Sequence, residues 1–154
     1  ITKEGSELLK VRYDNWFSSR AKTNYNGRNI VIKPKNIWCS KFDIFIDDND
    51  VGDLLFNWKG EIIIRVLRKK SEKSYLLRSK GFWKQTFELM DESNNLVLGL
   101  GPKMKSNGNF DYVVDRKASY IKEEEWVELL IFCGFAANLY LSTSQAALSG
   151  SVGI

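Results

Sequence analysis

The sequence predicts a mainly β fold, an antiparallel barrel or strongly curved sheet that encloses one hydrophobic C-terminal helix. Short segments rich in β-branched and aromatic residues recur at intervals of about ten residues, as in antiparallel β proteins. A sequence pattern repeats at an offset of 45 residues, and one long apolar segment near the C-terminus has the composition of a helix. The chain has 154 residues, of which 44% are hydrophobic, so it is long enough for one domain with a substantial core.

Alternating or β-branched patterns predict seven strands, at residues 29–33, 42–46, 61–67, 74–78, 86–90, 96–100 and 110–115. Residues 8–20 carry three aromatic residues, and we interpret this segment as strand-like. Acidic and Asn-rich turns separate several of the strands, at residues 47–50 and 91–95. Pro34 and Pro102 are expected at strand ends, where a missing N–H does little harm.

Residues 29–45 match residues 74–90 without a gap. The matched pairs include Lys33 with Arg78, Lys35 with Lys80, Trp38 with Trp83, Phe42 with Phe87, and Asp43 with Glu88. An acidic turn and an apolar run follow each copy. The pattern predicts two pseudo-symmetric halves of one sheet, with repeats at about residues 29–66 and 74–114. Two copies are too few for a solenoid.

Residues 123–141 are predicted to form the core helix. Three glutamates open the segment, where negative charge favours a helix N-terminus. The remainder is apolar nearly all round, which indicates burial in a core or in a membrane. Its length falls short of a bilayer, and Glu128 and Asn138 would be costly there, so burial in protein is favoured. We expect Glu128 near the mouth of the barrel, beside water or a basic partner.

Within this helix, small side chains are expected to mark where the sheet approaches most closely, at Gly134, Ala136 and Ala137. The expected domain spans residues 1–141, and residues 142–154 are interpreted as a C-terminal tail. Cys39 and Cys133 are most simply free thiols, with one disulfide as the alternative. The predicted core comprises Ile30, Ile32, Phe42, Ile44, Leu55, Ile63, Leu77, Phe87, Leu89, Leu98, Val113, Leu130, Phe132, Phe135 and Leu139.

Composition excludes several classes of function. The chain contains no His, which removes catalysis by His and most zinc sites. The acidic turn at residues 47–50 does not fit the ligand pattern of an EF-hand calcium loop. Gly99 and Gly101 are followed by Pro102, which would break the helix that a dinucleotide-binding loop needs directly after its glycines. We therefore expect no cofactor and no metal. A net charge of +4 is mild, so no specific nucleic-acid partner is expected, although stacking of single strands on aromatic residues stays open.

The duplicated basic and aromatic residues are the candidate ligand-binding residues: Lys33, Lys35, Trp38, Arg78, Lys80 and Trp83. In one interpretation each Trp plugs an end of the barrel and each basic pair is simply solvated. In the other, the cations form a rim that binds phosphate or lipid headgroups, with Trp at the interface. The matched carboxylates Asp43 and Glu88 leave a carboxylate-based enzyme open as a third interpretation.

Each of the two strand-rich halves contains an F-[DE]-[IL] motif followed by an acidic turn, and one apolar helix follows both halves. In this arrangement the chain resembles the tubby C-terminal-like superfamily. This group includes the LURP-one-related proteins and the phospholipid scramblases. The resemblance covers about residues 29–141 and implies a barrel of about twelve strands around a central helix. Residues 83–100 resemble the LURP-one-type run, but Asn94 and Asn95 replace the usual Gly of its acidic turn. No phosphoinositide motif matches residue by residue, so no family site is carried over.

Together these observations favour a non-catalytic binding module, with anionic phospholipid, a membrane surface or phosphorylated ligands as the candidate partners. The alternatives are a structural, self-associating protein and an unrecognised carboxylate-based enzyme. Residues 1–15 lack the apolar stretch of a signal peptide, so a cytoplasmic, membrane-peripheral location is expected.

Overall fold

The computed structural model describes residues 2–3, 6–7, 12–13, 20–68, 71–81, 85–104 and 110–149. The strands are β1 (Thr2–Lys3), β2 (Ser6–Glu7), β3 (Arg12–Tyr13), β4 (Ala21–Tyr25), β5 (Arg28–Pro34), β6 (Lys41–Ile46), β7 (Asn49–Phe56), β8 (Ile62–Arg68), β9 (Ser71–Lys80), β10 (Thr86–Met90), β11 (Leu96–Met104) and β12 (Phe110–Arg116). They are followed by one helix, α1 (Glu123–Ser149).

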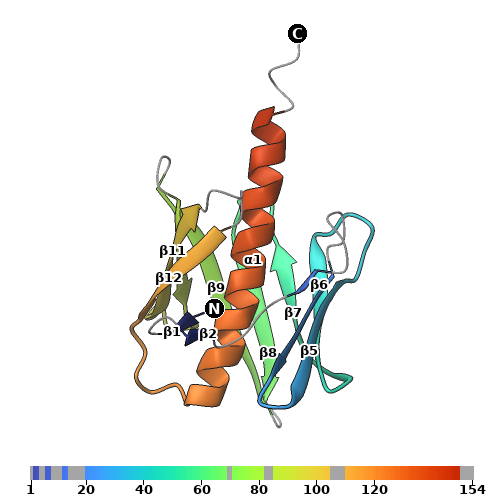
Figure 1. Ribbon diagram of the computed structural model, residues 1–154, viewed down its shortest axis with the longest axis vertical. Coiled ribbons are helices and arrows are strands. Elements are labelled where there is room, and N and C mark those ends of the chain that lie inside the picture. The colour runs from blue at the N-terminus through green and yellow to red at the C-terminus, as the bar shows by residue number, and fades with distance from the viewer. Residues whose placement is uncertain are drawn as a thin grey trace.

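The strands β3 to β12 form one ten-stranded antiparallel sheet, in which neighbours in space are also neighbours in sequence. The sheet passes behind α1 and flanks it on both sides (Figure 1). Within the described residues β3 and β12 are its two edges and do not pair, so the closed barrel is not found and the sheet is open. α1 lies between the two flanks of this open sheet (Figure 1).

Alternate residues of most strands from β4 to β11 are buried, and together with residues of α1 they form the core. Eleven of the fifteen predicted core residues are buried, among them Phe42, Phe87 and Phe135. Four predicted core residues are not buried. Leu55, Ile63 and Leu139 are half-buried, and Val113 is 58% exposed. Leu55 and Ile63 each lie next to a buried residue of the same strand. Leu55, Ile63 and Val113 each adjoin another apolar residue in the strand, so alternation could not specify which of the two faces the core.

All seven predicted strands are present, with boundaries that differ by a few residues. β4 was not predicted, and β7 was noted only as an apolar run. Pro102 lies inside β11 rather than at its end. Residues Leu96–Leu100 of β11 pair with β10, whereas Pro102 pairs with β12 alone. Because Pro102 lies beyond the part of β11 that pairs with β10, the N–H that it lacks is not needed for a hydrogen bond to β10.

The helix continues past the predicted end, from Leu141 to Ser149, and these last turns extend beyond the sheet (Figure 1). Ala136 and Ala137 are fully buried, as expected of close approach to the sheet. The expectation for Gly134 is wrong, because a Cβ placed there would meet nothing within 4 Å. Both cysteines are free, and burial raises the pKa of the Cys133 thiol.

The acidic first turn of α1 is tied to the sheet by ion pairs. Arg28 donates to Glu124 over 2.6 Å, and Lys73 donates to Glu125 over 2.9 Å. One turn further along, Glu128 is 1% exposed, with Arg28 at 2.8 Å and Arg68 in contact with its other oxygen. The basic partner expected for Glu128 is therefore present, and these contacts fix which end of the sheet the helix enters.

Candidate functional site

Two of the predicted binding lysines form ion pairs with a carboxylate on a neighbouring strand. Lys35 lies 3.3 Å from Asp43, and Lys80 lies 2.6 Å from Glu88. Both carboxylates lie between buried residues of their strands, so they face away from α1 on the outer surface of the sheet. These contacts give Asp43 and Glu88 a structural role in holding neighbouring strands together.

The other two predicted cations also have partners. The Lys33 ammonium lies 4.3 Å from the centre of the Phe45 ring, an arrangement typical of a cation–π contact. Arg78 donates its Nε hydrogen to Glu61 over 3.1 Å. Lys33 and Arg78 occupy matched positions in the two copies, yet their partners differ.

Trp38 does not plug the sheet, because 82% of its surface is exposed. Its loop is a turn in which Cys39 N donates to Asn36 O, and the Asn36 side chain accepts from Ser40 N over 3.1 Å. Ile37 and Trp38 occupy the two central positions of this turn and point outward, so Ile37 is 89% exposed. Trp83 lies outside the described residues.

A second turn of the same design carries Trp58, a residue that the sequence interpretation missed. Asn57 Oδ1 accepts from the backbone N–H groups of Lys59 and Glu61, over 2.9 and 3.0 Å. Gly60 completes the turn with a positive φ of 75°, which suits Gly. Trp58 is left 91% exposed, and the Lys59 ammonium lies 5.5 Å from the centre of its ring. The turn sequence Asn-Trp-Lys-Gly was the available signal.

The two turns are neighbours at one end of the sheet. They connect β5 to β6 and β7 to β8, and Phe56 N donates to Ser40 O over 2.8 Å. We call the exposed side chains of Ile37, Trp38 and Trp58 the tip surface. Each is more than 80% exposed, so three large apolar side chains project into solvent at this end of the sheet.

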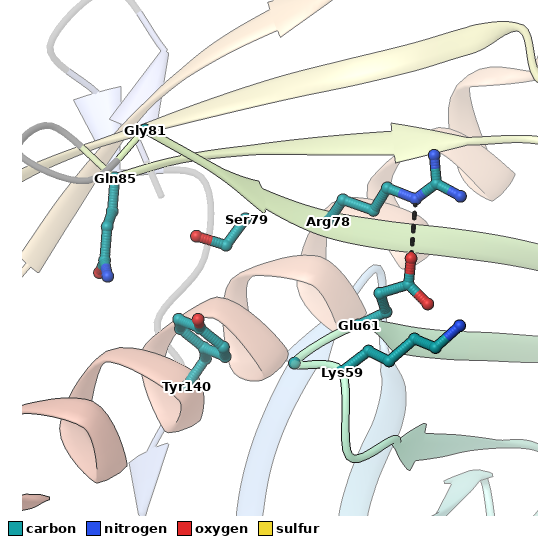
Figure 2. Close-up of a pocket in the computed structure, with 8 residues that line it drawn as sticks. Lys59, Glu61, Arg78, Ser79, Gly81, Gln85 and Tyr140 are labelled. Atoms are coloured by element: carbon teal, nitrogen blue, oxygen red, sulfur yellow. Dashed lines mark hydrogen bonds and ion pairs between the residues drawn. The ribbon is translucent and has the colours of Figure 1, made fainter.

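A pocket of about 550 Å³ lies beside this end of the sheet. Figure 2 shows Tyr140 of α1, Ser79 and Gln85 at one side, and Lys59, Glu61 and Arg78 at the other. The pocket thus contains one of the predicted binding residues, Arg78, and none of the other described ones. Its remaining lining residues are Gly60 and Gly81.

The charge of the pocket alternates in sign. Asn57 donates to Glu61 Oε2 over 2.9 Å. This hydrogen bond and the nearby charges of Arg78 and Lys59 lower the pKa of the Glu61 carboxyl. Desolvation opposes them but has the smaller effect. Glu61 is therefore an anion at neutral pH, between two cations.

No group of three or more Cys, Asp or Glu residues that could hold a metal ion occurs in the part of the chain that the structure describes. The segment Glu123–Ser144 is long and apolar enough to cross a membrane by length and composition, but 61% of its apolar 18-residue window is buried inside the protein. A core helix meets the same criteria, and the sheet around α1 gives it that environment.

Searches with protein-family models, against curated proteins and against solved structures found no match to this chain.

Proposed function

We propose that the protein is a non-catalytic module that binds anionic membrane surfaces through the tip surface. The observation that carries this proposal is the exposure of Ile37, Trp38 and Trp58 on two hydrogen-bonded turns. Water makes such exposure unfavourable, by about 1.5–3 kcal/mol for a large apolar side chain relative to full burial. Tryptophan is enriched at the boundary between water and lipid, where its apolar ring and its N–H both find partners.

Lysines accompany these apolar side chains. Lys59 is next to Trp58 and in contact with its ring, and Lys35 precedes the turn that carries Trp38. Cations close to a membrane surface are attracted to anionic lipids, by about 1 kcal/mol each near the surface. The expected location is therefore peripheral, on a cytoplasmic leaflet that is rich in anionic lipid.

Self-association through the same residues is the alternative. A two-fold dimer brings the same patch of both subunits together. Lys59 would then face a second copy of itself or of Lys35, and like charges oppose such a contact. The charge of the lysines beside the tip surface thus favours an anionic lipid partner over a second copy.

The duplicated sequence supports a further proposal, that the chain consists of two related halves. Ile32 pairs with Ile44 between β5 and β6, and Leu77 pairs with Leu89 between β9 and β10. Each residue of the second pair lies 45 positions after its counterpart. The acidic partners of Lys35 and Lys80 follow the same offset. The resemblance to the tubby-like superfamily stays a prediction.

The membrane proposal is tested by co-sedimentation of the full chain with phosphatidylcholine vesicles, with and without phosphatidylserine. We expect binding only when phosphatidylserine is present, weakened by added salt. The triple variant Ile37→Ala, Trp38→Ala, Trp58→Ala should lose at least about tenfold in affinity, because the inserted apolar area is gone.

Val113→Ala on edge strand β12 is the matched control, since it also removes an exposed apolar side chain. It should bind vesicles like the original protein. Absence of binding to phosphatidylserine vesicles at low salt would contradict the proposal. A concentration-dependent mass in solution that the triple variant abolishes would support self-association instead.

A further inference from the structure

The pocket beside the tip surface has the charges and the size for a ligand of its own. Its volume of about 550 Å³ lies within the range of small-molecule sites in proteins. It is lined by hydroxyl and amide groups of Ser79, Gln85 and Tyr140, which come from two strand ends and from α1. Figure 2 shows these groups across the pocket from the charged side chains.

The alternating charges limit which ligands fit. A ligand that carries only negative charge would meet the carboxylate of Glu61, which lies 3.1 Å from Arg78. A ligand that carries only positive charge would meet Arg78 and Lys59. Like charges at short range are unfavourable in both cases. A ligand with one group of each sign, joined by a short arm, avoids both conflicts.

Arg78 and Glu61 both retain hydrogen-bonding atoms that such a ligand can use. Arg78 uses Nε for Glu61, and its guanidinium has two further nitrogen atoms that carry donors, a geometry suited to phosphate. Glu61 accepts one hydrogen bond at each oxygen, from Arg78 and from Asn57, and each oxygen has a second lone pair. An ammonium group can therefore be added without breaking either bond.

We propose that this pocket binds zwitterionic phosphate esters, with the phosphate at Arg78 and Lys59 and the ammonium group at Glu61. Ethanolamine phosphate is the simplest ligand of this class. The ester can belong to a free metabolite or to the headgroup of a lipid. In the lipid case the inference rests on the proposed membrane function, because Lys59 adjoins Trp58 of the tip surface.

Isothermal titration of the full chain with phosphoethanolamine, inorganic phosphate and ethanolamine tests the pocket without a membrane. We expect phosphoethanolamine to bind at least about tenfold more tightly than either other probe, since only it satisfies both signs of charge. Arg78→Gln should weaken phosphoethanolamine binding by about tenfold or more. Lys117→Gln, which removes a cation that pairs with Asp115 instead, is the control and should bind normally.

Glu61→Gln gives the sharpest result, because it should weaken phosphoethanolamine binding and strengthen binding of inorganic phosphate. A simple anion site would gain affinity for both ligands in this variant, and that outcome would overturn the proposal. Equal affinities for phosphoethanolamine and inorganic phosphate in the original protein would also overturn it, as would no binding of any probe.

Vesicles identify the source of the ester. If the ligand is a lipid, phosphatidylethanolamine added to vesicles that contain phosphatidylserine should strengthen binding of the original protein but not of Glu61→Gln. If it is a free metabolite, phosphoethanolamine binds in solution and phosphatidylethanolamine has no effect. Loss of vesicle binding in the tip-surface triple variant, with titration of phosphoethanolamine unchanged, separates the two proposals.

Discussion

Glu128 is a carboxylate enclosed by the core, where an unpaired charge would be strongly unfavourable. Its two oxygens meet the guanidinium groups of Arg28 and Arg68, which reach it from the ends of β5 and β8. The side chains of Arg28 and Arg68 remain 35% and 27% exposed, so their excess charge is shared with water. The cluster joins α1 to the ends of β5 and β8.

Replacing Glu128 by Gln leaves both arginines close together without their common counter-ion. We expect this variant to lose on the order of 2–3 kcal/mol of unfolding free energy, less than for a fully buried pair, because the arginines stay partly solvated. Urea unfolding followed by circular dichroism measures the loss. Lys117→Gln breaks an exposed ion pair and should change stability by no more than about 0.5 kcal/mol. Equal stability of Glu128→Gln and the original protein would contradict this role.

Two glycines should respond to alanine with opposite signs. Gly134 is helical and has open space where a Cβ would stand, so Gly134→Ala should stabilise the protein by about 0.5–1 kcal/mol through helix propensity. Gly52 has a φ of +148°, and its Cβ would lie 2.0 Å from the backbone oxygen of Arg65. Gly52→Ala should therefore lower the melting temperature. If Gly134→Ala also lowers it, the packing around α1 described above is wrong.

At the scale of elements, charged side chains join the strands on the outer face of the sheet. Asp53 on β7 accepts two hydrogen bonds of 2.7 Å from Arg65 on β8, and Lys41 on β6 lies 3.1 Å away. Partial burial raises the pKa of the Asp53 carboxyl, but the bonds and charges of Arg65 and Lys41 outweigh that effect and lower it. Three consecutive strands are thus coupled through one carboxylate.

This coupling gives stability a defined dependence on pH. Because the folded pKa is lower than the unfolded value of about 3.9, the contribution of Asp53 is present above that pH and is lost as the pH falls through the folded pKa. The melting temperature should therefore fall as the pH is lowered from about 5 to about 2. Asp53→Asn should show a lower melting temperature at neutral pH and a shallower fall in acid. Identical pH profiles of the two proteins would rule out this contribution.

Sequence patterns predicted the elements better than they predicted the faces of those elements. Alternation placed Phe42 and Ile44 correctly, because the polar residue Asp43 separates them. The three isoleucines at residues 62–64 offered no such contrast, so Ile63 was assigned to the wrong face. Register and burial there are set by neighbouring strands, which local sequence does not reveal.

The candidate site was predictable only in part. The duplicated cations led to Arg78, which does line the pocket, but their ion pairs depend on which strands become neighbours. Trp58 has no counterpart in the repeat, and its exposure follows from the Asn57 turn. The contribution of Tyr140 required the position of α1 against the sheet, which no spacing in the sequence specifies.

At the scale of the whole molecule, helix and sheet share one core. The buried cluster includes residues from β4 to β11 and from α1, so neither part buries its apolar surface without the other. We expect one cooperative unfolding transition, with the same midpoint by far-ultraviolet circular dichroism and by tryptophan fluorescence. Lys117→Gln should keep the two midpoints together. Midpoints that differ would show that α1 or part of the sheet unfolds independently.

The position of α1 after every described strand has a consequence for biosynthesis. A ribosome completes the strands first, and their consecutive pairing allows hairpins to form as the chain emerges. The apolar inner face of the sheet then has no cover until α1 leaves the exit tunnel. Nascent chains arrested before residue 123 should therefore bind chaperones that recognise exposed apolar surface, and release of α1 should end that binding, as crosslinking on stalled ribosomes can measure.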